Sequence, residues 1–117
     1  SWETSDLERA LYYETLPYTN KMYSCRFYRS FLQLASEVQC KDYLKNVSPK
    51  PPVLLMSGTQ DMVGDKGAYA KEKAGLLIEN GFDVRLEIFD GMRHSILQEV
   101  QRENVYRLIY EFIRENI

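Results

Sequence analysis

The chain has 117 residues, a mass of 13.8 kDa and a formal net charge of -2 at pH 7. A chain of this length supports one hydrophobic core, and its 44% hydrophobic and 27% charged residues are typical of a globular protein, which excludes a disordered or collagen-like chain. Residues 1–50 carry a charge of +1, from seven Lys and Arg against six Asp and Glu, and residues 51–117 carry -3, from eight against eleven. This balance leaves no basic face for phosphate groups, so no nucleic acid is expected as a partner.

The sequence contains no apolar run near the roughly 20 residues that span a bilayer, and its start lacks the pattern of a secretory signal. The two cysteines, Cys25 and Cys40, are predicted to be free thiols, because a chain with this much core does not need a disulfide. We therefore expect a soluble, cytoplasmic protein. Because the chain begins at Ser1 without an initiator Met, we also expect processing or a longer parent protein.

Three prolines within residues 48–52 divide the sequence into two predicted parts. Prolines prevent helix continuation, so we place a boundary there, between a helical segment at 1–48 and a second part at 49–117. In the first part, a capping-box pattern at 5–8 predicts a short helix that ends before Pro17. A second helix is predicted from near Ser24, and a short third segment around 41–44. The apolar face of the second helix is predicted to pack in the core; it consists of Phe27, Tyr28, Phe31, Leu34, Ala35 and Val38.

The second part alternates strands and helices in the order of a parallel α/β fold. The apolar run at 53–56 predicts a strand that is buried on both faces. A helix over 66–80, stopped by Gly81, is followed by an alternating strand over 84–88. The last predicted element is a long amphipathic helix that starts at Leu97. Two strands joined in this way are parallel, so the predicted fold class is α/β, with two parallel strands and flanking helices.

Polar loops follow both predicted strands, at the edge where parallel α/β sheets gather their catalytic groups. The loop at 57–65 contains Asp61 and Asp65, and the loop at 90–95 contains Asp90 and the only histidine, His94. Because paired strands lie about 4.8 Å apart, an Asp and His94 can come within hydrogen-bonding distance. Such a pair supplies two members of a nucleophilic triad: the carboxylate orients the imidazole, whose other nitrogen accepts a hydroxyl proton. From spacing alone, a structural histidine and turn-forming aspartates stay open, and Asp65 and Asp90 compete as the acid.

The residues of these two loops resemble a known family. The run Pro52–Gly58 followed by Asp61-Met62-Val63-Gly64 is similar to the acid-bearing strand and loop of α/β-hydrolases of the monoacylglycerol lipase and lysophospholipase (serine aminopeptidase-like) type, which read strand, Gly, two residues and Asp-Pro-Val-Gly. The run Phe89–His94, followed by two apolar residues and Gln98-Glu99, resembles their histidine loop, where Arg-His-Glu precedes two apolar residues and Asn-Glu. Upstream, Ser1-Trp2 and the aromatic helix at 27–32 resemble the end of the family's cap segment, so the likeness covers essentially the whole chain.

The resemblance implies roles for particular residues. Asp61 matches the triad acid and His94 the triad base. Arg93 and Glu99 match positions that we interpret as structural, either in contact with each other or as a solvated surface pair. The sequence departs from the family's pattern at three positions, none of which removes the acid or the base: Met62 stands for Pro, Ser95 for Glu and Gln98 for Asn.

A nucleophile is absent from this sequence. The family carries its serine in Gly-x-Ser-x-Gly on a strand-to-helix turn, and no such motif occurs in the 117 residues. Since the family's chain order is Ser, Asp, His, the resemblance implies the C-terminal portion of an α/β-hydrolase fold, preceded by a helical cap-like segment. It also implies a serine hydrolase that acts on carboxylic esters of lysophospholipid or monoacylglycerol type, without cofactor or metal. The chain alone is expected to be inactive, because its partner, the missing N-terminal half, carries the serine.

Other hypotheses stay open at this point. In the first, the chain is a non-catalytic binding or assembly module that keeps hydrolase topology. In the second, it is a small doubly wound domain that binds phosphate near Gly64 and Gly67. A metal site on Asp61, Asp65 and His94 fits no common ligand pattern. Four aromatic residues of the first part either line an acyl pocket or form simple core: Tyr23, Phe27, Tyr28 and Phe31. The strand at 53–57 would expose an open edge, which predicts self-association.

Overall fold

The computed structural model describes residues 1–19, 21–38 and 42–117. The predicted free thiol of Cys40 and the start of the third helical segment at Lys41 lie outside these residues. Cys25 is a free thiol and is exposed. In the described part of the chain, no helix is both long enough and apolar enough to cross a membrane.

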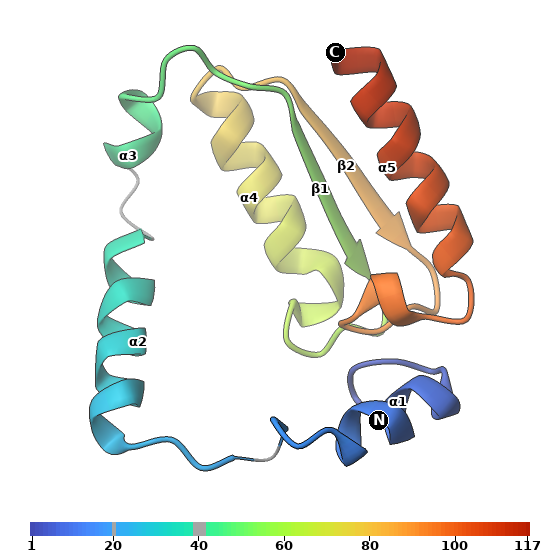
Figure 1. The fold of residues 1–117 in the computed structure, drawn as a ribbon. Coiled ribbons are helices and arrows are strands. Elements are labelled where there is room, and N and C mark those ends of the chain that lie inside the picture. Colours follow the sequence, from blue (N-terminus) through green and yellow to red (C-terminus); the bar gives the residue numbers. More distant parts are fainter. Residues whose placement is uncertain (20, 39–41) are drawn as a thin grey trace.

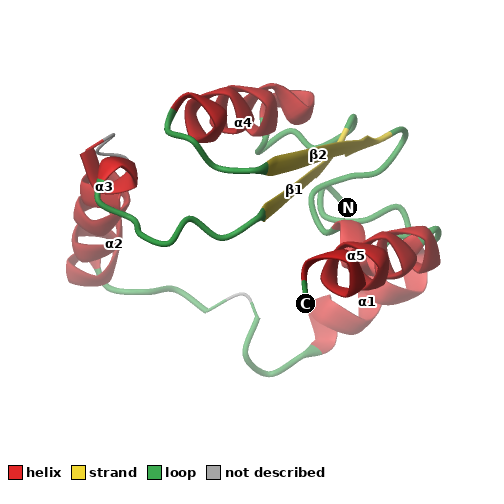
Figure 2. Ribbon diagram, turned by 90° about the horizontal axis from the view of Figure 1, so that it is seen from above, coloured by secondary structure: helices red, strands yellow, loops and turns green. Residues whose placement is uncertain are grey.

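Two parallel strands form the sheet, and helices lie on both of its sides (Figure 2). Strand β1, Val53–Gly58, pairs with β2, Val84–Phe89, in a register that sets Val53 opposite Val84 and Gly58 opposite Phe89. Helix α4, Ala68–Glu79, connects the strands and packs on both, while α5, Arg102–Asn116, lies on the other side. The predicted mixed α/β class, with a two-stranded parallel sheet and flanking helices, is confirmed.

The first part of the chain forms helices that extend away from the sheet (Figure 1). Helix α1, Leu7–Thr15, lies near the carboxyl ends of the strands, and α2, Cys25–Val38, and α3, Asp42–Lys45, follow it. The Cα radius of gyration is 16.5 Å, whereas a compact chain of this length has about 13 Å. The difference reflects this excursion, because α2 stands apart from the strands in both views.

Helix α1 begins later than the capping-box pattern predicts. Its N-cap is Asp6, whose Oδ1 accepts the backbone N–H of Arg9 at 3.2 Å, whereas Ser5 bonds to Glu99. The helix ends before Pro17, as predicted. Whether Ser5 or Asp6 caps the helix therefore depends on Glu99, which lies far along the chain and is not visible in the local sequence pattern.

The later helices also begin after their predicted starts. Helix α4 begins at Ala68 rather than at Lys66, because the 3-10 turn before it, Asp65–Gly67, has positive φ angles of 47°, 54° and 88°. Helix α5 begins at Arg102 rather than at Leu97, which lies in a separate 3-10 turn, Ile96–Gln98. The predicted stop of α4 is confirmed, since Gly81 takes a φ of 80° and donates to the carbonyl of Ile78 at 2.8 Å.

No residue of α2 is buried, so the prediction that its apolar face packs in the core is wrong. Phe27, Tyr28 and Phe31 keep 46%, 50% and 58% of their surface exposed. The rings contact one another instead, with centroids 4.5 Å apart for Tyr23 and Phe27 and 6.3 Å apart for Phe27 and Phe31. Helical periodicity identifies the apolar side of a helix, but it does not identify an element that covers this side.

The sheet is less buried than the apolar sequence of β1 predicts. Its residues from Val53 to Met56 are half-buried, and only Ser57 and Gly58 are buried. A sheet of two strands leaves each strand with one unpaired edge, so neither strand is enclosed. The buried apolar residues are accordingly few: Ala10, Ala74, Phe82, Met92 and Val105.

Candidate functional site

Two loops meet at the carboxyl edge of the sheet, because the parallel register ends with Gly58 beside Phe89. Backbone hydrogen bonds join the loops directly after the strands. The amide of Thr59 donates to the carbonyl of Phe89 at 2.9 Å, and the amide of Gln60 donates to the carbonyl of Met92 at 2.8 Å. These bonds hold the two loops together just before the predicted acid and the predicted base.

Gly58 allows the backbones of the two loops to touch. A Cβ atom at this position would lie 2.0 Å from the carbonyl oxygen of Met92 and 2.9 Å from that of Arg93. Both distances are below 3.0 Å, which real Cβ atoms essentially never reach, so space alone requires glycine here. Met92 is 3% exposed, which shows that this crossing lies in the interior.

The structure brings Asp61 and His94 together. Oδ1 of Asp61 lies 3.0 Å from Nδ1 of His94. Asp61 is 6% exposed, whereas the side chain of His94 keeps 41% of its surface exposed. No group of the described residues bonds to Nε2 of His94, so this nitrogen is available for proton exchange. The pair therefore has the buried acid and the accessible imidazole that base catalysis requires.

Backbone amides hold Asp61 as a carboxylate. Its Oδ1 accepts the amides of Val63 at 2.9 Å and Gly64 at 3.0 Å. Burial opposes ionisation of Asp61, but the amide of Gly64, the ring of His94 and the amide of Val63 together lower the pKa of Asp61 below its ordinary value. Because an ionised carboxylate only accepts hydrogen bonds, Nδ1 of His94 carries the ring proton, and Nε2 accepts when the ring is neutral.

Gly64 gives the turn around this carboxylate its close fit. A Cβ atom at Gly64 would lie 2.7 Å from Oδ2 of Asp61. A side chain at this position would therefore push the carboxylate away from the two amides that bind it. The lack of space for a side chain thus explains why the Asp-Met-Val-Gly run ends in glycine in this structure.

The two competing acids do not contact His94 within the described residues. Oδ1 of Asp90 accepts the hydroxyl of Thr59 at 3.0 Å, and this hydroxyl oxygen accepts the amide of Gly91 at 2.8 Å. Asp65 lies in the 3-10 turn before α4. Across the described ranges, no three or more His, Cys, Asp and Glu side chains gather into a cluster that could hold a metal ion. The hypothetical metal site that included Asp65 is therefore not assembled.

The amino-terminal segment, residues 1–6, lies along the histidine loop. The ring of Trp2 packs against the ring of His94, with centroids 5.3 Å apart and an angle of 34° between the planes. The amide of Ser95 donates to the carbonyl of Glu3 at 2.7 Å. The amino-terminal segment therefore packs against the histidine loop, directly beside the predicted base.

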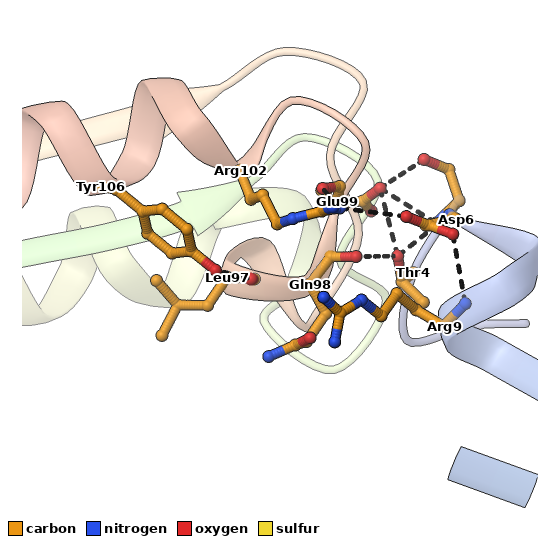
Figure 3. A network of polar contacts seen from close by, with 9 residues as sticks. Thr4, Asp6, Arg9, Leu97, Gln98, Glu99, Arg102 and Tyr106 are labelled. Atoms are coloured by element: carbon orange, nitrogen blue, oxygen red, sulfur yellow. Dashed lines mark hydrogen bonds and ion pairs between the residues drawn. The ribbon is translucent and has the colours of Figure 1, made fainter. Parts of the chain in front are cut away.

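Glu99 contacts both the amino-terminal segment and the histidine loop. Figure 3 shows its carboxylate beside Thr4 of the amino-terminal segment. Glu99 is 1% exposed, and its Oε2 accepts the amide of Ser5 at 3.0 Å, the hydroxyl of Ser5 and the hydroxyl of Thr4 at 3.4 Å. Its Oε1 accepts the amide of Arg93 at 2.7 Å. Burial opposes ionisation of Glu99, but the hydroxyl of Ser5 and the amides of Arg93 and Ser5 lower the pKa of Glu99 below its ordinary value.

Arg93 and Glu99 are in contact, but not as an ion pair. The contact is made by the amide of Arg93, while Nη1 of its guanidinium donates to the carbonyl of Thr4 at 3.1 Å and to the carbonyl of Ser1. The alternative of a solvated surface pair is therefore wrong, because the carboxylate is buried. The predicted structural role agrees with these contacts.

The family resemblance points to Arg93 and Glu99 as structural positions beside the predicted acid and base, but not to the partners of Glu99 in the amino-terminal segment. No spacing rule connects Ser5 with Glu99, which are 94 positions apart. The steric role of Gly64 depends on where Asp61 points, which is a property of the folded chain.

The aromatic residues of α2, and Tyr23 just before it, do not surround the Asp61–His94 pair. Helix α2 lies away from the carboxyl edge of the strands in both views (Figures 1 and 2). Tyr23 and Phe27 are 54% and 46% exposed. In this structure these rings thus form neither the core nor the wall of an acyl pocket.

Comparisons with known proteins add no family to this geometry: no protein-family model matches the chain, and no curated protein matches it significantly. A functional assignment therefore rests on the residues and contacts described above.

Proposed function

We propose that Asp61 and His94 are the acid and the base of a Ser-His-Asp triad in a serine hydrolase that cleaves carboxylic esters. One observation carries the proposal: Oδ1 of buried Asp61 lies 3.0 Å from Nδ1 of His94, at the carboxyl edge of two parallel strands. Parallel α/β sheets collect their catalytic groups at this edge. The lowered pKa of Asp61 supports its role as an ionised partner of the ring.

Each residue has a defined role in the proposed reaction. Nε2 of His94 removes the proton of a serine hydroxyl as its oxygen attacks the ester carbonyl carbon, and His94 then donates that proton to the leaving alcohol. In the second half, Nε2 removes a proton from water, the resulting hydroxide attacks the acyl carbon, and the proton returns to the serine oxygen. Asp61 holds the Nδ1 proton throughout and stabilises the imidazolium.

The serine must come from another stretch of polypeptide, because the 117 residues contain no Gly-x-Ser-x-Gly. We infer that the chain is the C-terminal portion of an α/β-hydrolase fold, with a cap-like segment at 1–48 and core strands at 49–117. The unpaired edges of β1 and β2 support this inference, since further strands would complete such a sheet. The sequence resemblance favours lysophospholipids or monoacylglycerols as substrates, and the chain alone would be inactive.

Labelling with a fluorophosphonate, which reacts with activated serines, tests the proposal on the protein that contains this chain and the serine segment. We expect the wild type to be labelled. The labelling rate should fall by roughly 10⁴-fold in Asp61→Asn and by a similar factor in His94→Ala, as in other triads. Asp90→Asn is the matched control, because Asp90 lies in the neighbouring loop and contacts Thr59 rather than His94. Full reactivity of both Asp61→Asn and His94→Ala would contradict the assignment.

A non-catalytic binding or assembly module is the second candidate. The exposed aromatic face of α2 and the unpaired strand edges favour it, because both are surfaces through which chains associate. The same labelling experiment separates the candidates, since a module that lacks an activated serine does not react. Light scattering at high concentration tests the association, and a strictly monomeric profile argues against it.

A further inference from the structure

Glu99 is a buried charged residue that the proposed reaction does not use. It is 1% exposed, and its two oxygens face different segments of the chain. Oε1 accepts the amide of Arg93 in the histidine loop at 2.7 Å, and Oε2 accepts the amide of Ser5 in the amino-terminal segment at 3.0 Å. A buried carboxylate is costly unless its oxygens are paired, so this arrangement is stable only with both segments in place.

We propose that Glu99 is a positioning residue, which holds the histidine loop against the amino-terminal segment and thereby keeps Nδ1 of His94 directed at Asp61. The catalytic use of this orientation rests on the proposed function. The contact that it explains, between His94 and Asp61, exists independently of any reaction.

The backbone around His94 is held on both sides. Arg93 precedes it and donates its amide to Glu99 at 2.7 Å, and Ser95 follows it and donates its amide to the carbonyl of Glu3 at 2.7 Å. The backbone amide of Ser95 is thus linked to the amino-terminal segment directly, and that of Arg93 through the Glu99 carboxylate. The guanidinium of Arg93 adds a direct side-chain link to the carbonyls of Thr4 and Ser1. With both neighbours fixed, the ring of His94 has little freedom to leave the Asp61 carboxylate.

The chemistry of this contact requires a carboxylate rather than an amide. Both oxygens of Glu99 accept from donors: the amide of Arg93 on one side, and the amide and hydroxyl of Ser5 with the hydroxyl of Thr4 on the other. Glutamine has one acceptor oxygen, and its amino group would face a donor. Glu99→Gln therefore leaves one of the two backbone amides without a partner in the interior.

The test reads the His94 ring directly by NMR. In the wild type we expect a resonance for the Nδ1 proton that is slow to exchange with water, assigned by its loss in His94→Gln. In Glu99→Gln we expect this proton to exchange roughly tenfold faster or more, since a hydrogen bond from a buried group is lost. Far-UV circular dichroism and urea unfolding measure folding separately. An unchanged exchange rate in folded Glu99→Gln would overturn the proposal.

Two further variants complete the test. Glu103→Gln is the matched control, because it makes the same change of charge at an exposed position in the first turn of α5, and we expect wild-type exchange. If Glu99→Gln does not fold, Ser5→Ala decides instead: it removes only the hydroxyl donor, and it should accelerate the exchange of the His94 proton. Exchange as slow as in the wild type would then overturn the proposal.

The result is distinguishable from a failure of the proposed function. The exchange rate reports the Asp61–His94 contact whether or not the protein hydrolyses an ester. A protein that does not react with the fluorophosphonate, but loses the protected proton in Glu99→Gln, supports the positioning role and contradicts the hydrolase. The opposite pair of results contradicts only the positioning role.

Discussion

Gly58→Ala is the substitution for which the structure gives the clearest quantitative expectation. Gly58 ends β1 at the point where the histidine loop crosses it. The added Cβ would lie 2.0 Å from the carbonyl oxygen of Met92 and 2.5 Å from its carbonyl carbon. Both atoms are backbone, so no side-chain rotation relieves the overlap, and the two loops must move apart.

The size of the movement follows from these distances. Ordinary contact begins at 3.4 Å, so the carbonyl of Met92 must retreat by 1.4 Å from its 2.0 Å distance. That shift breaks its hydrogen bond with the amide of Gln60, now 2.8 Å long. Overpacking and an unpaired buried carbonyl each cost about 1–3 kcal/mol, so we expect roughly 2–6 kcal/mol of lost stability. Because Met92 is two residues before His94, the contact of His94 with Asp61 opens as well.

Urea unfolding and the Nδ1 proton resonance of His94 measure the two effects. Gly75→Ala is the control, because its Cβ meets nothing within 4 Å and it lies inside α4. There we expect a gain of about 0.5–1 kcal/mol from helix propensity, with the resonance unchanged. If Gly58→Ala unfolds at the wild-type urea concentration and keeps the resonance, the reasoning about this crossing is refuted.

A further prediction concerns stability in acid. The pKa values of Asp61 and Glu99 are lowered in the folded state, so their stabilisation is complete above the ordinary values of 3.8 and 4.5 and is lost as pH falls toward the lowered ones. Glu99→Gln should therefore make the decline of the urea midpoint in acid shallower, and an unchanged decline contradicts the assignment.

The strands and helices of the second part follow from short-range patterns. The apolar run at 53–56 and the alternation from Val84 to Ile88 are each sufficient for a strand, and the helix between them makes the strands parallel. The positive φ angles at Asp65 and Lys66 are not encoded in this way, because a left-handed conformation is rare for a residue with a side chain such as Lys66. The start of α4 therefore depends on the turn that closes around Asp61.

The candidate pair is predictable for a similar reason. Parallel strands place their carboxyl ends at one edge, so Asp61 and His94 need only the order of elements to become neighbours. The selection of Asp61 over Asp90 needs more, because both residues follow strands. It depends on side-chain direction: Asp90 turns to the hydroxyl of Thr59, and Asp61 turns to the ring.

The surroundings of the pair depend on contacts that no local pattern contains. Glu99 meets Ser5 across 94 positions, and burial of a charge at this place is visible only when both segments are folded. The apolar face of α2 shows a second limit of sequence-based prediction, which concerns what covers an apolar surface. Its period is correct, but Phe27 and Phe31 have no covering element among the described residues.

The position of Trp2 against the ring of His94 has a practical consequence for spectroscopy. Trp2 is the only tryptophan of the sequence, it is 55% exposed, and its ring centroid lies 5.3 Å from that of His94. Its emission therefore comes from a point beside the candidate base. A dissolved quencher that reaches Trp2 would report solvent access to this side of the site without any substrate.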